Sequence, residues 1–229
     1  MRDEMNGDTY SETACAVISH VFGCDESLAR IIEIKARVEN YPPRTLIVEG
    51  ESVFEHIYLL IDGRARMLAY SIDGRLVAVE DYGRGDLFGE NGLFAHETAQ
   101  HDVAAIELSC AAAFTNGAFL GLMSNYSCVA LTVSRLLVER LSSMSRRLVE
   151  GATLSAAGRI HAELLRQARA GEAMTIQPPP VLSAFALLVQ STRETVSRAI
   201  STLEKRGIIL RDEHGLRIVA PHRLEELIY

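Results

Sequence analysis

Short runs of Val, Ile, Leu and Tyr separated by glycines fill the segment from about Thr45 to Glu107. Apolar runs of this length, bounded by turn residues, are typical of strands in an antiparallel barrel or sandwich. Asp73-Gly74 lies between two such runs and is typical of a type I′ hairpin, whose two central residues both need positive φ. Pro42-Pro43 predicts the end of a preceding helical segment. The pattern therefore predicts an antiparallel β-roll.

The pattern becomes helical after Asn116, and no Gly or Pro interrupts residues 127–150. Alternating steps of four and three residues separate a set of seam positions, which is the spacing of a coiled coil. Val133 and Leu136 widen the apolar face on one side, enough to pack the helix against the roll. An ordinary buried helix is the alternative to a dimerisation helix over residues 127–151. The seam consists of Ala130, Ser134, Leu137, Leu141, Met144 and Leu148.

Two short helices with a tight turn between them are predicted near the C-terminus, after a hinge of small residues at 151–158. The first helix, Val181–Gln190, is apolar, and the second runs from Thr192 to about Arg206 with Ser191 or Thr192 as its N-cap. Residues 207–220 then alternate apolar side chains around an acidic turn, which predicts a β-hairpin. These are the parts of a winged helix-turn-helix.

One face of the second helix is wholly polar, and its positive charges outnumber its negative ones. At 3.6 residues per turn this face covers about 140°, and the opposite side carries Val196, Ala199, Ile200 and Leu203. An arginine in the first turn opposes the helix dipole, so we expect the face to serve a partner. The face consists of Arg193, Glu194, Ser197, Arg198, Ser201 and Lys205.

This face suits the base edges of DNA. Arginine can donate two parallel hydrogen bonds to O6 and N7 of guanine, and a carboxylate can accept one from N4 of cytosine. Arg193, Glu194 and Arg198 are therefore predicted to read adjacent G·C pairs in the major groove, with the serines and the lysine near bases or phosphates. Thr192 completes the predicted DNA-binding set. An amphipathic helix with a solvated polar face is the alternative.

The charge distribution agrees with a separate DNA-binding part. The net charge of −7 argues by itself against a nucleic-acid partner. Residues 152–229, however, carry ten Lys and Arg against eight Asp and Glu, whereas residues 1–151 carry thirteen against twenty-two. The sequence therefore predicts an acidic body joined to a smaller module that tolerates anions.

Several classes of protein are disfavoured. The chain lacks an apolar run of membrane-spanning length and the basic-then-apolar order of a secretory signal, so we expect a cytoplasmic protein without a membrane partner. The cysteines form no C-x-x-C pair, and Cys110 in its apolar run is expected in the core. A cupin-type enzyme would need metal ligands such as His56, His96, His101 and Glu90, but no His-x-His pair exists. We expect no catalytic site, metal or cofactor.

The motifs GRGDLFGENGLF (residues 83–94) and STRETVSRAISTLEKRGII (residues 191–209) resemble the CRP/FNR superfamily of bacterial transcription regulators. The resemblance covers roughly Arg44 to Ala220. It implies an α+β fold with an N-terminal antiparallel, jelly-roll-like β-roll, a long dimerisation helix and a C-terminal winged helix-turn-helix. The implied domains are residues 1–126 (N-terminal helices and a cyclic-nucleotide-binding-like sensor), 127–151 (dimerisation helix) and 152–229 (DNA binding).

The resemblance also implies partners. A homodimer would bind double-stranded DNA at an inverted repeat of TGTGA-like half-sites, with recognition helices about one DNA turn apart. Arg193, Glu194 and Arg198 match the base-reading positions of the family, and RNA polymerase is an expected further partner. The alternative is a degenerate regulator that dimerises with another family member and does not itself bind DNA.

The segment that would hold cyclic AMP departs from the family pattern. Cyclic AMP-binding members place an Arg and then Ser or Thr on the cyclic phosphate, where this chain has Gln100 and His101, or Ala99 and Gln100 in a register shifted by one. No Lys or Arg occurs between Arg84 and Arg135. Removing one partner of a buried charge pair weakens binding by about 3–5 kcal/mol of free energy. This corresponds to a loss of affinity of roughly a few hundred-fold to a few thousand-fold. We therefore expect a regulator that is independent of effectors or has an unknown one.

Other positions of the predicted effector pocket match the family better. Glu90 matches a ribose 2′-hydroxyl contact, and Arg140 with Ser145 lies where the dimerisation helix contacts ligand in the family. An ion pair between Glu90 and Arg140 is the favoured alternative role. An atypical cyclic-nucleotide site and a haem or redox sensor remain alternatives, although Cys15 and Cys24 do not form the cysteine cluster of an iron–sulfur protein. The predicted pocket residues are Gly89, Glu90, Asn91, Gln100, His101, Arg140, Met144 and Ser145.

The DNA-binding part departs from the family in two places. Val181, Leu182, Ser183 and Ala184 stand where the family usually has a Thr and a polar or acidic pair that help contact phosphates at the start of the first helix. Gln190 replaces the usual turn glycine. Fewer phosphate contacts predict weaker non-specific binding and a shallower salt dependence.

Overall fold

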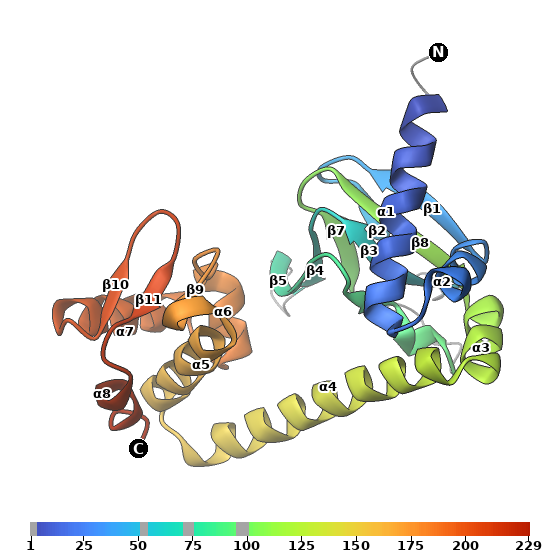
Figure 1. Cartoon of the computed structure of the whole chain (residues 1–229). Helices are drawn as coiled ribbons and strands as arrows, with labels where there is room; N and C mark the ends of the chain where they lie inside the picture. The colour runs from blue at the N-terminus through green and yellow to red at the C-terminus, as the bar shows by residue number, and fades with distance from the viewer. Residues whose placement is uncertain (1–3, 51–54, 71–75, 95–100) are drawn as a thin grey trace. The chain divides into compact units, whose positions relative to one another are not determined.

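The computed structural model describes residues 4–50, 55–70, 76–94 and 101–229 (Figure 1). The chain forms two compact units, Met1–Val138 and Glu139–Tyr229. The boundary between them lies inside helix α4 (Ser127–Thr153), which extends two residues beyond the predicted helix. The division into domains 1–126, 127–151 and 152–229 stays a prediction.

The first unit contains two four-stranded antiparallel sheets, so the predicted β-roll is confirmed. Their strand orders are β1-β8-β3-β6 and β2-β7-β4-β5. The strands are β1 (Ala36–Tyr41), β2 (Leu46–Val48), β3 (His56–Asp62), β4 (Ala65–Tyr70), β5 (Leu76–Tyr82), β6 (Leu87–Phe88), β7 (Asp102–Ala105) and β8 (Ser109–Thr115). The predicted turn Asp73-Gly74 lies outside the described residues, but the strands on either side of it pair in antiparallel register from Ala65↔Tyr82 to Tyr70↔Leu76.

The predicted end of a helix at Pro42-Pro43 is wrong, because these prolines follow strand β1. The preceding helix α2 (Glu26–Glu33) ends earlier, and β1 pairs with β8 along its whole length. Ala36, Val38 and Tyr41 of β1 pack against the cores of the roll and are only partly buried, so the strand lacks the apolar run that the sequence pattern requires. Its pairing with the buried strand β8 determines its conformation.

Helices cover one face of the sheet that contains β3 and β8. Ile57 and Leu59 of β3 and Phe114 of β8 share a core with α1 (Glu4–Phe22), α2 and α3 (Asn116–Asn125). Val129 and Val133 at the start of α4 are buried in the same core, with Leu136 packed against it. This confirms the prediction that one side of α4 packs against the roll.

The space between the two sheets is filled by apolar and aromatic side chains. Phe88 stacks on Tyr58 with ring centroids 5.1 Å apart and on Tyr82 at 4.9 Å. Leu60 and Ala111 from one sheet and Val103 and Ala105 from the other complete this second core. Alternate residues of β3 thus contact the helices and the facing sheet in turn, because strand side chains point to opposite faces.

The second unit packs four helices and a small sheet around one core in its described residues, which confirms the winged helix-turn-helix. The elements are α5 (Ala156–Ala170), η2 (Glu172–Met174), β9 (Thr175–Ile176), α6 (Leu182–Leu188), α7 (Arg193–Lys205), β10 (Ile209–Arg211), β11 (Leu216–Ile218) and α8 (Pro221–Glu225). The sheet order is β10-β11-β9, so the predicted hairpin gains a third strand. The predicted hinge is shorter than expected, since only Leu154 and Ser155 separate α4 from α5.

No single helix among the described residues is both long enough and apolar enough to cross a membrane. Helices α3 and α4, which meet at a bend of 111°, pass the same test of length and composition only when taken together. Phe119, Leu122, Val129 and Val133 of this pair are buried in the core of the roll.

Two of the four free cysteine thiols should be inert in the folded protein. Cys15 and Cys110 are buried, and burial raises the pKa of both thiols, for Cys110 to about 11. Since the thiolate is the reactive form, we expect neither to react with a disulfide reagent at about pH 8 until the protein unfolds. Mass spectrometry of labelled peptides with and without denaturant checks this, and rapid native labelling of Cys110 would contradict it.

Candidate DNA interface and effector site

Helix α7 begins at an N-cap and divides cleanly into a buried and an exposed face. The hydroxyl of Thr192 accepts a hydrogen bond from the backbone N–H of Thr195 at 3.2 Å, so Thr192 rather than Ser191 is the N-cap. Val196, Ile200 and Leu203 are buried in the core of the second unit, which confirms the predicted packing face. This packing orients the other face outward.

The predicted DNA-binding residues lie together on that outer face. Ser197 is half-buried, and the others are exposed: Thr192, Arg193, Glu194, Arg198, Ser201 and Lys205. Across the described parts of the chain, no ion pair neutralises Arg193, Arg198 or Lys205. Arg198 Nε contacts only the backbone oxygen of Glu194, at 3.4 Å. The positive charge of this face is therefore available to an anionic partner.

The turn before α7 is held by an arginine that the sequence pattern did not single out. Gln190 has φ +50°, the left-handed conformation that costs a residue with a Cβ about 1–2 kcal/mol. The guanidinium of Arg159 on α5 donates to the carbonyls of Val189 at 2.8 Å and Gln190 at 2.9 Å. Sequence reasoning missed this contact because it joins residues about thirty positions apart and its acceptors are backbone oxygens.

The wing hairpin is stabilised at its tip. Asp212 Oδ1 accepts hydrogen bonds from the backbone N–H groups of His214 and Gly215, both at 2.8 Å. These bonds lower the pKa of the Asp212 carboxyl. Arg211 and Arg217 lie exposed on the two wing strands and add cations to the unit beyond those of α7.

The Gly-Glu motif of the roll forms a tight turn. Gly89 has φ +89°, and a Cβ at this position would lie 2.6 Å from the carbonyl oxygen of His56, so only glycine fits. Glu90–Gly92 form a short 3₁₀ helix, in which Asn91 is exposed. Asn116 Nδ2 donates to the carbonyl of Gly92 at 2.9 Å and holds this turn to the start of α3.

The segment proposed to replace the phosphate contact is only partly described. Gln100 lies outside the described residues, as do Ala99 and His96. His101 directly precedes β7, and its Nδ1 is buried without a hydrogen-bond partner among the described residues. Across the described residues, no three His, Cys, Asp or Glu side chains gather in a way that could hold a metal ion.

The arginines at the start of β4 are already paired. Arg66 Nε lies 2.5 Å from Asp81 Oδ1, and Arg64 Nη2 lies 3.4 Å from the other oxygen of the same carboxylate. Ala65 and Met67, on either side of Arg66, pack into the core between the sheets. Because strand side chains alternate, Arg66 points away from that interior.

The predicted seam of α4 is exposed in the single chain except at Ala130, which is half-buried. Leu137, Leu141, Met144 and Leu148 all present apolar side chains to solvent, and Ser134 donates to the carbonyl of Ala130 at 2.8 Å. Arg140 and Ser145 lie on the same helix. Glu90 belongs to the first unit and Arg140 to the second, so their ion pair stays a prediction.

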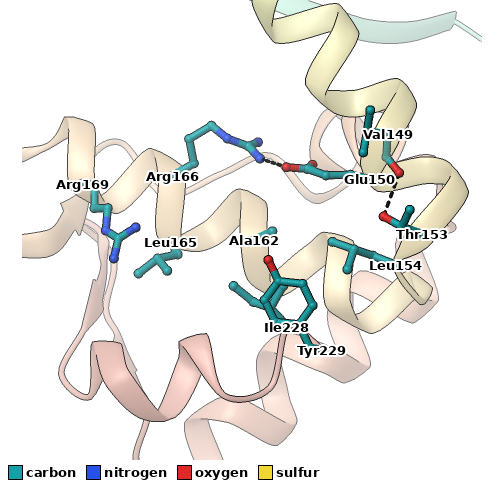
Figure 2. Close-up of a pocket in the computed structure, with 10 residues that line it drawn as sticks. All are labelled: Val149, Glu150, Thr153, Leu154, Ala162, Leu165, Arg166, Arg169, Ile228 and Tyr229. Atoms are coloured by element: carbon teal, nitrogen blue, oxygen red, sulfur yellow. Dashed lines mark hydrogen bonds and ion pairs between the residues drawn. The ribbon is translucent and has the colours of Figure 1, made fainter.

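A pocket of about 350 Å³ lies between the end of α4, helix α5 and the C-terminus (Figure 2). Leu154, Leu165 and Ile228 supply apolar lining. Arg166 at its edge pairs with Glu150 and Glu163, and Arg169 pairs with Glu225. Because glutamates neutralise both arginines, the pocket lacks the free cation of an anion site, and the Arg166–Glu150 pair instead links the last turns of α4 to α5.

Comparisons with known proteins agree with this architecture. Residues 38–126 match the family model for a cyclic nucleotide-binding domain, and residues 158–227 match that for a Crp-like helix-turn-helix domain. The chain is 29% identical over 187 residues to the cAMP-activated global transcriptional regulator CRP of Pasteurella multocida, covering 80% of this chain and 88% of the relative.

Solved structures show the same fold. The catabolite activator protein of Thermus thermophilus matches with a TM-score of 0.55 and 23% identity, over 93% of this chain and 98% of the other. The c-di-GMP responsive global regulator CLP of Xanthomonas campestris matches with a TM-score of 0.69 and 20% identity, over 85% and 99%. With a sensor-type roll, a long helix and a Crp-like helix-turn-helix in this order, the chain belongs to the CRP/FNR superfamily of DNA-binding transcription regulators.

Proposed function

We propose that the chain acts as a homodimer on an inverted repeat of TGTGA-like half-sites and binds it without cyclic AMP. The observation that supports DNA reading is the outer face of α7, where Arg193, Glu194 and Arg198 are exposed and the arginines have no carboxylate partner among the described residues. The apolar side chains on the opposite face of α7 are buried in the core of the second unit, so this face points outward. RNA polymerase is the further partner expected of such a regulator.

The base preference follows from the donor and acceptor pattern of the face. Two arginines on adjacent turns of a helix suit guanines, and a carboxylate between them suits the cytosine of a neighbouring pair. A half-site such as TGTGA presents guanines separated by one base pair, with cytosines opposite. The exposed seam of α4 supports a two-fold dimer, which an inverted repeat would match.

Independence of cyclic AMP is supported by the charges of the roll. Arg64 and Arg66 both pair with Asp81, and no Lys or Arg occurs between residues 84 and 135. A cyclic phosphate here would be left to backbone N–H groups. The Pasteurella relative is described as cAMP-activated, so the proposal separates this chain from that relative.

Fluorescence anisotropy on a labelled TGTGA-N6-TCACA duplex tests the proposal, with a scrambled duplex as the sequence control. We expect selective binding that is the same with and without saturating cyclic AMP. The Pasteurella regulator in the same buffer is the positive control for a response to the nucleotide. Selectivity that appears only with cyclic AMP would overturn the nucleotide independence, and equal binding to the scrambled duplex would overturn the half-site. A further titration with c-di-GMP tests the effector named for the Xanthomonas regulator.

A further inference from the structure

Arg159 joins two connections that are far apart in the sequence. Its guanidinium donates to the carbonyl of Leu154 at 3.0 Å, in the link between α4 and α5. It also donates to the carbonyls of Val189 and Gln190, in the turn between α6 and α7. The planar guanidinium carries five N–H donors in a fixed arrangement, so it can hold both connections in one geometry.

Gln190 adds a second link between the same two places. A Cβ placed on Gly151, in the last turn of α4, would lie 2.9 Å from Gln190 Oε1 and 3.9 Å from Nε2. The amide of Gln190 therefore lies against bare backbone at the end of α4. Glycine, here Gly151, is unfavourable inside a helix. Glutamine, here Gln190, is unfavourable at φ +50°. Two residues that are unfavourable for their local conformation thus meet at one contact. Departures from local preference of this kind are expected at functional positions.

The contact lies directly before the recognition helix. Gln190 is two residues from Thr192, the N-cap of α7, so a shift of its backbone changes the direction in which α7 leaves the turn. In a two-fold dimer the recognition helices must lie about 34 Å apart to enter successive major grooves. The direction of α7 relative to the end of α4 therefore contributes to the half-site spacing that the dimer accepts.

We propose that Arg159 and Gln190 are positioning residues for DNA binding. They hold the start of α7 against Gly151 at the end of α4 and against Leu154 in the link that follows, and so set the accepted half-site spacing. This inference rests on the proposed homodimer and inverted repeat. It assigns a role to the glutamine that replaces the turn glycine usual in the family. All four residues belong to the second unit.

The test uses the full chain with Gln190→Gly and duplexes whose half-sites are separated by five, six or seven base pairs. Glycine adopts the left-handed conformation without cost, so Tm should be unchanged or higher. The preference for the best spacer over the others should nevertheless fall, by about 2- to 30-fold. A merely structural residue would not change the spacer preference while leaving Tm intact.

Ala173→Gly is the matched control, because Ala173 is another exposed residue of this unit with φ +50° and lies outside the contact. It should affect Tm in the same direction and leave the spacer preference unchanged.

Gly151→Ala should weaken the spacer preference in the wild-type background by displacing the Gln190 amide. It should have no further effect on that preference in the Gln190→Gly background. Arg159→Lys should retain part of the preference that Arg159→Ala loses.

The outcomes separate this inference from the proposed function. Wild-type protein without any spacer preference would overturn the inverted repeat, and with it the positioning role. A wild-type preference that persists unchanged in folded, dimeric Gln190→Gly would overturn the positioning role alone. Additive effects of Gly151→Ala and Gln190→Gly on the spacer preference would also overturn it, because residues in direct contact are expected to couple.

Discussion

Replacing Leu137 and Leu141 together by Asp should give monomers that no longer bind the operator duplex. These side chains are 41% and 68% exposed in the single chain, and the seam spacing predicts that a second copy covers them. Burying each leucine contributes about 1.5–3 kcal/mol, and four of them would meet across the two-fold axis. The substitution removes that contribution and places four carboxylates close together.

Sedimentation velocity and anisotropy on the inverted repeat check this result. The matched control replaces Leu46 and Leu108, which are 44% and 59% exposed on the roll, by Asp in the same way. This control should remain dimeric and retain its affinity, since neither leucine lies on α4. Dimers of the Leu137→Asp/Leu141→Asp variant with normal operator affinity would show that the seam is misassigned.

Arg193→Ala should produce the second large effect, a loss of affinity together with relaxed preference at one guanine of each half-site. A bidentate arginine–guanine contact contributes about 1–3 kcal/mol, so two half-sites would lose about 2–6 kcal/mol. At about 1.4 kcal/mol per decade this is roughly 30-fold to 20,000-fold in the dissociation constant. Because Arg193 is exposed and has no ion-pair partner in the described chain, Tm should change little.

The measurement is a set of anisotropy titrations on duplexes that change one base pair of the half-site at a time. Lys205→Ala is the control on the same helix face. If Lys205 contacts a phosphate, its loss should weaken binding to all duplexes equally and make the salt dependence shallower by about one unit per contact. An Arg193→Ala protein that discriminates among the bases as the wild type does would remove the proposed guanine contact.

Features that depend on short-range periodicity could be predicted from the sequence. The buried face of α7 recurs every three or four residues at Val196, Ile200 and Leu203, and the structure buries these side chains as expected. The glycine-bounded runs of the roll and the hairpin of the wing are equally local signals, since turn chemistry and side-chain alternation act over a few residues. The family motifs also predict the order of the β-roll, the long helix and the helix-turn-helix along the chain.

Strands whose conformation depends on the neighbouring strand with which they pair could be located only in the tertiary structure. The sequence pattern does not predict strand β1, because its sequence, ARVENY, has little apolar periodicity. The segment becomes a strand by hydrogen bonding to β8. Strand β9 is only two residues long, too short for a sequence pattern. Propensity is weak in such segments, so tertiary hydrogen bonds determine their conformation.

The predicted DNA-binding residues and the positioning contact illustrate the same division at the candidate site. The polar face of α7 is visible in the sequence because a helix places residues three and four apart on one side. The bonds from Arg159 to Leu154, Val189 and Gln190 leave no such trace, since every residue has a backbone carbonyl and folding alone selects these three. Sequence periodicity thus determined which residues face outward, and long-range packing decided how the helix that carries them is held.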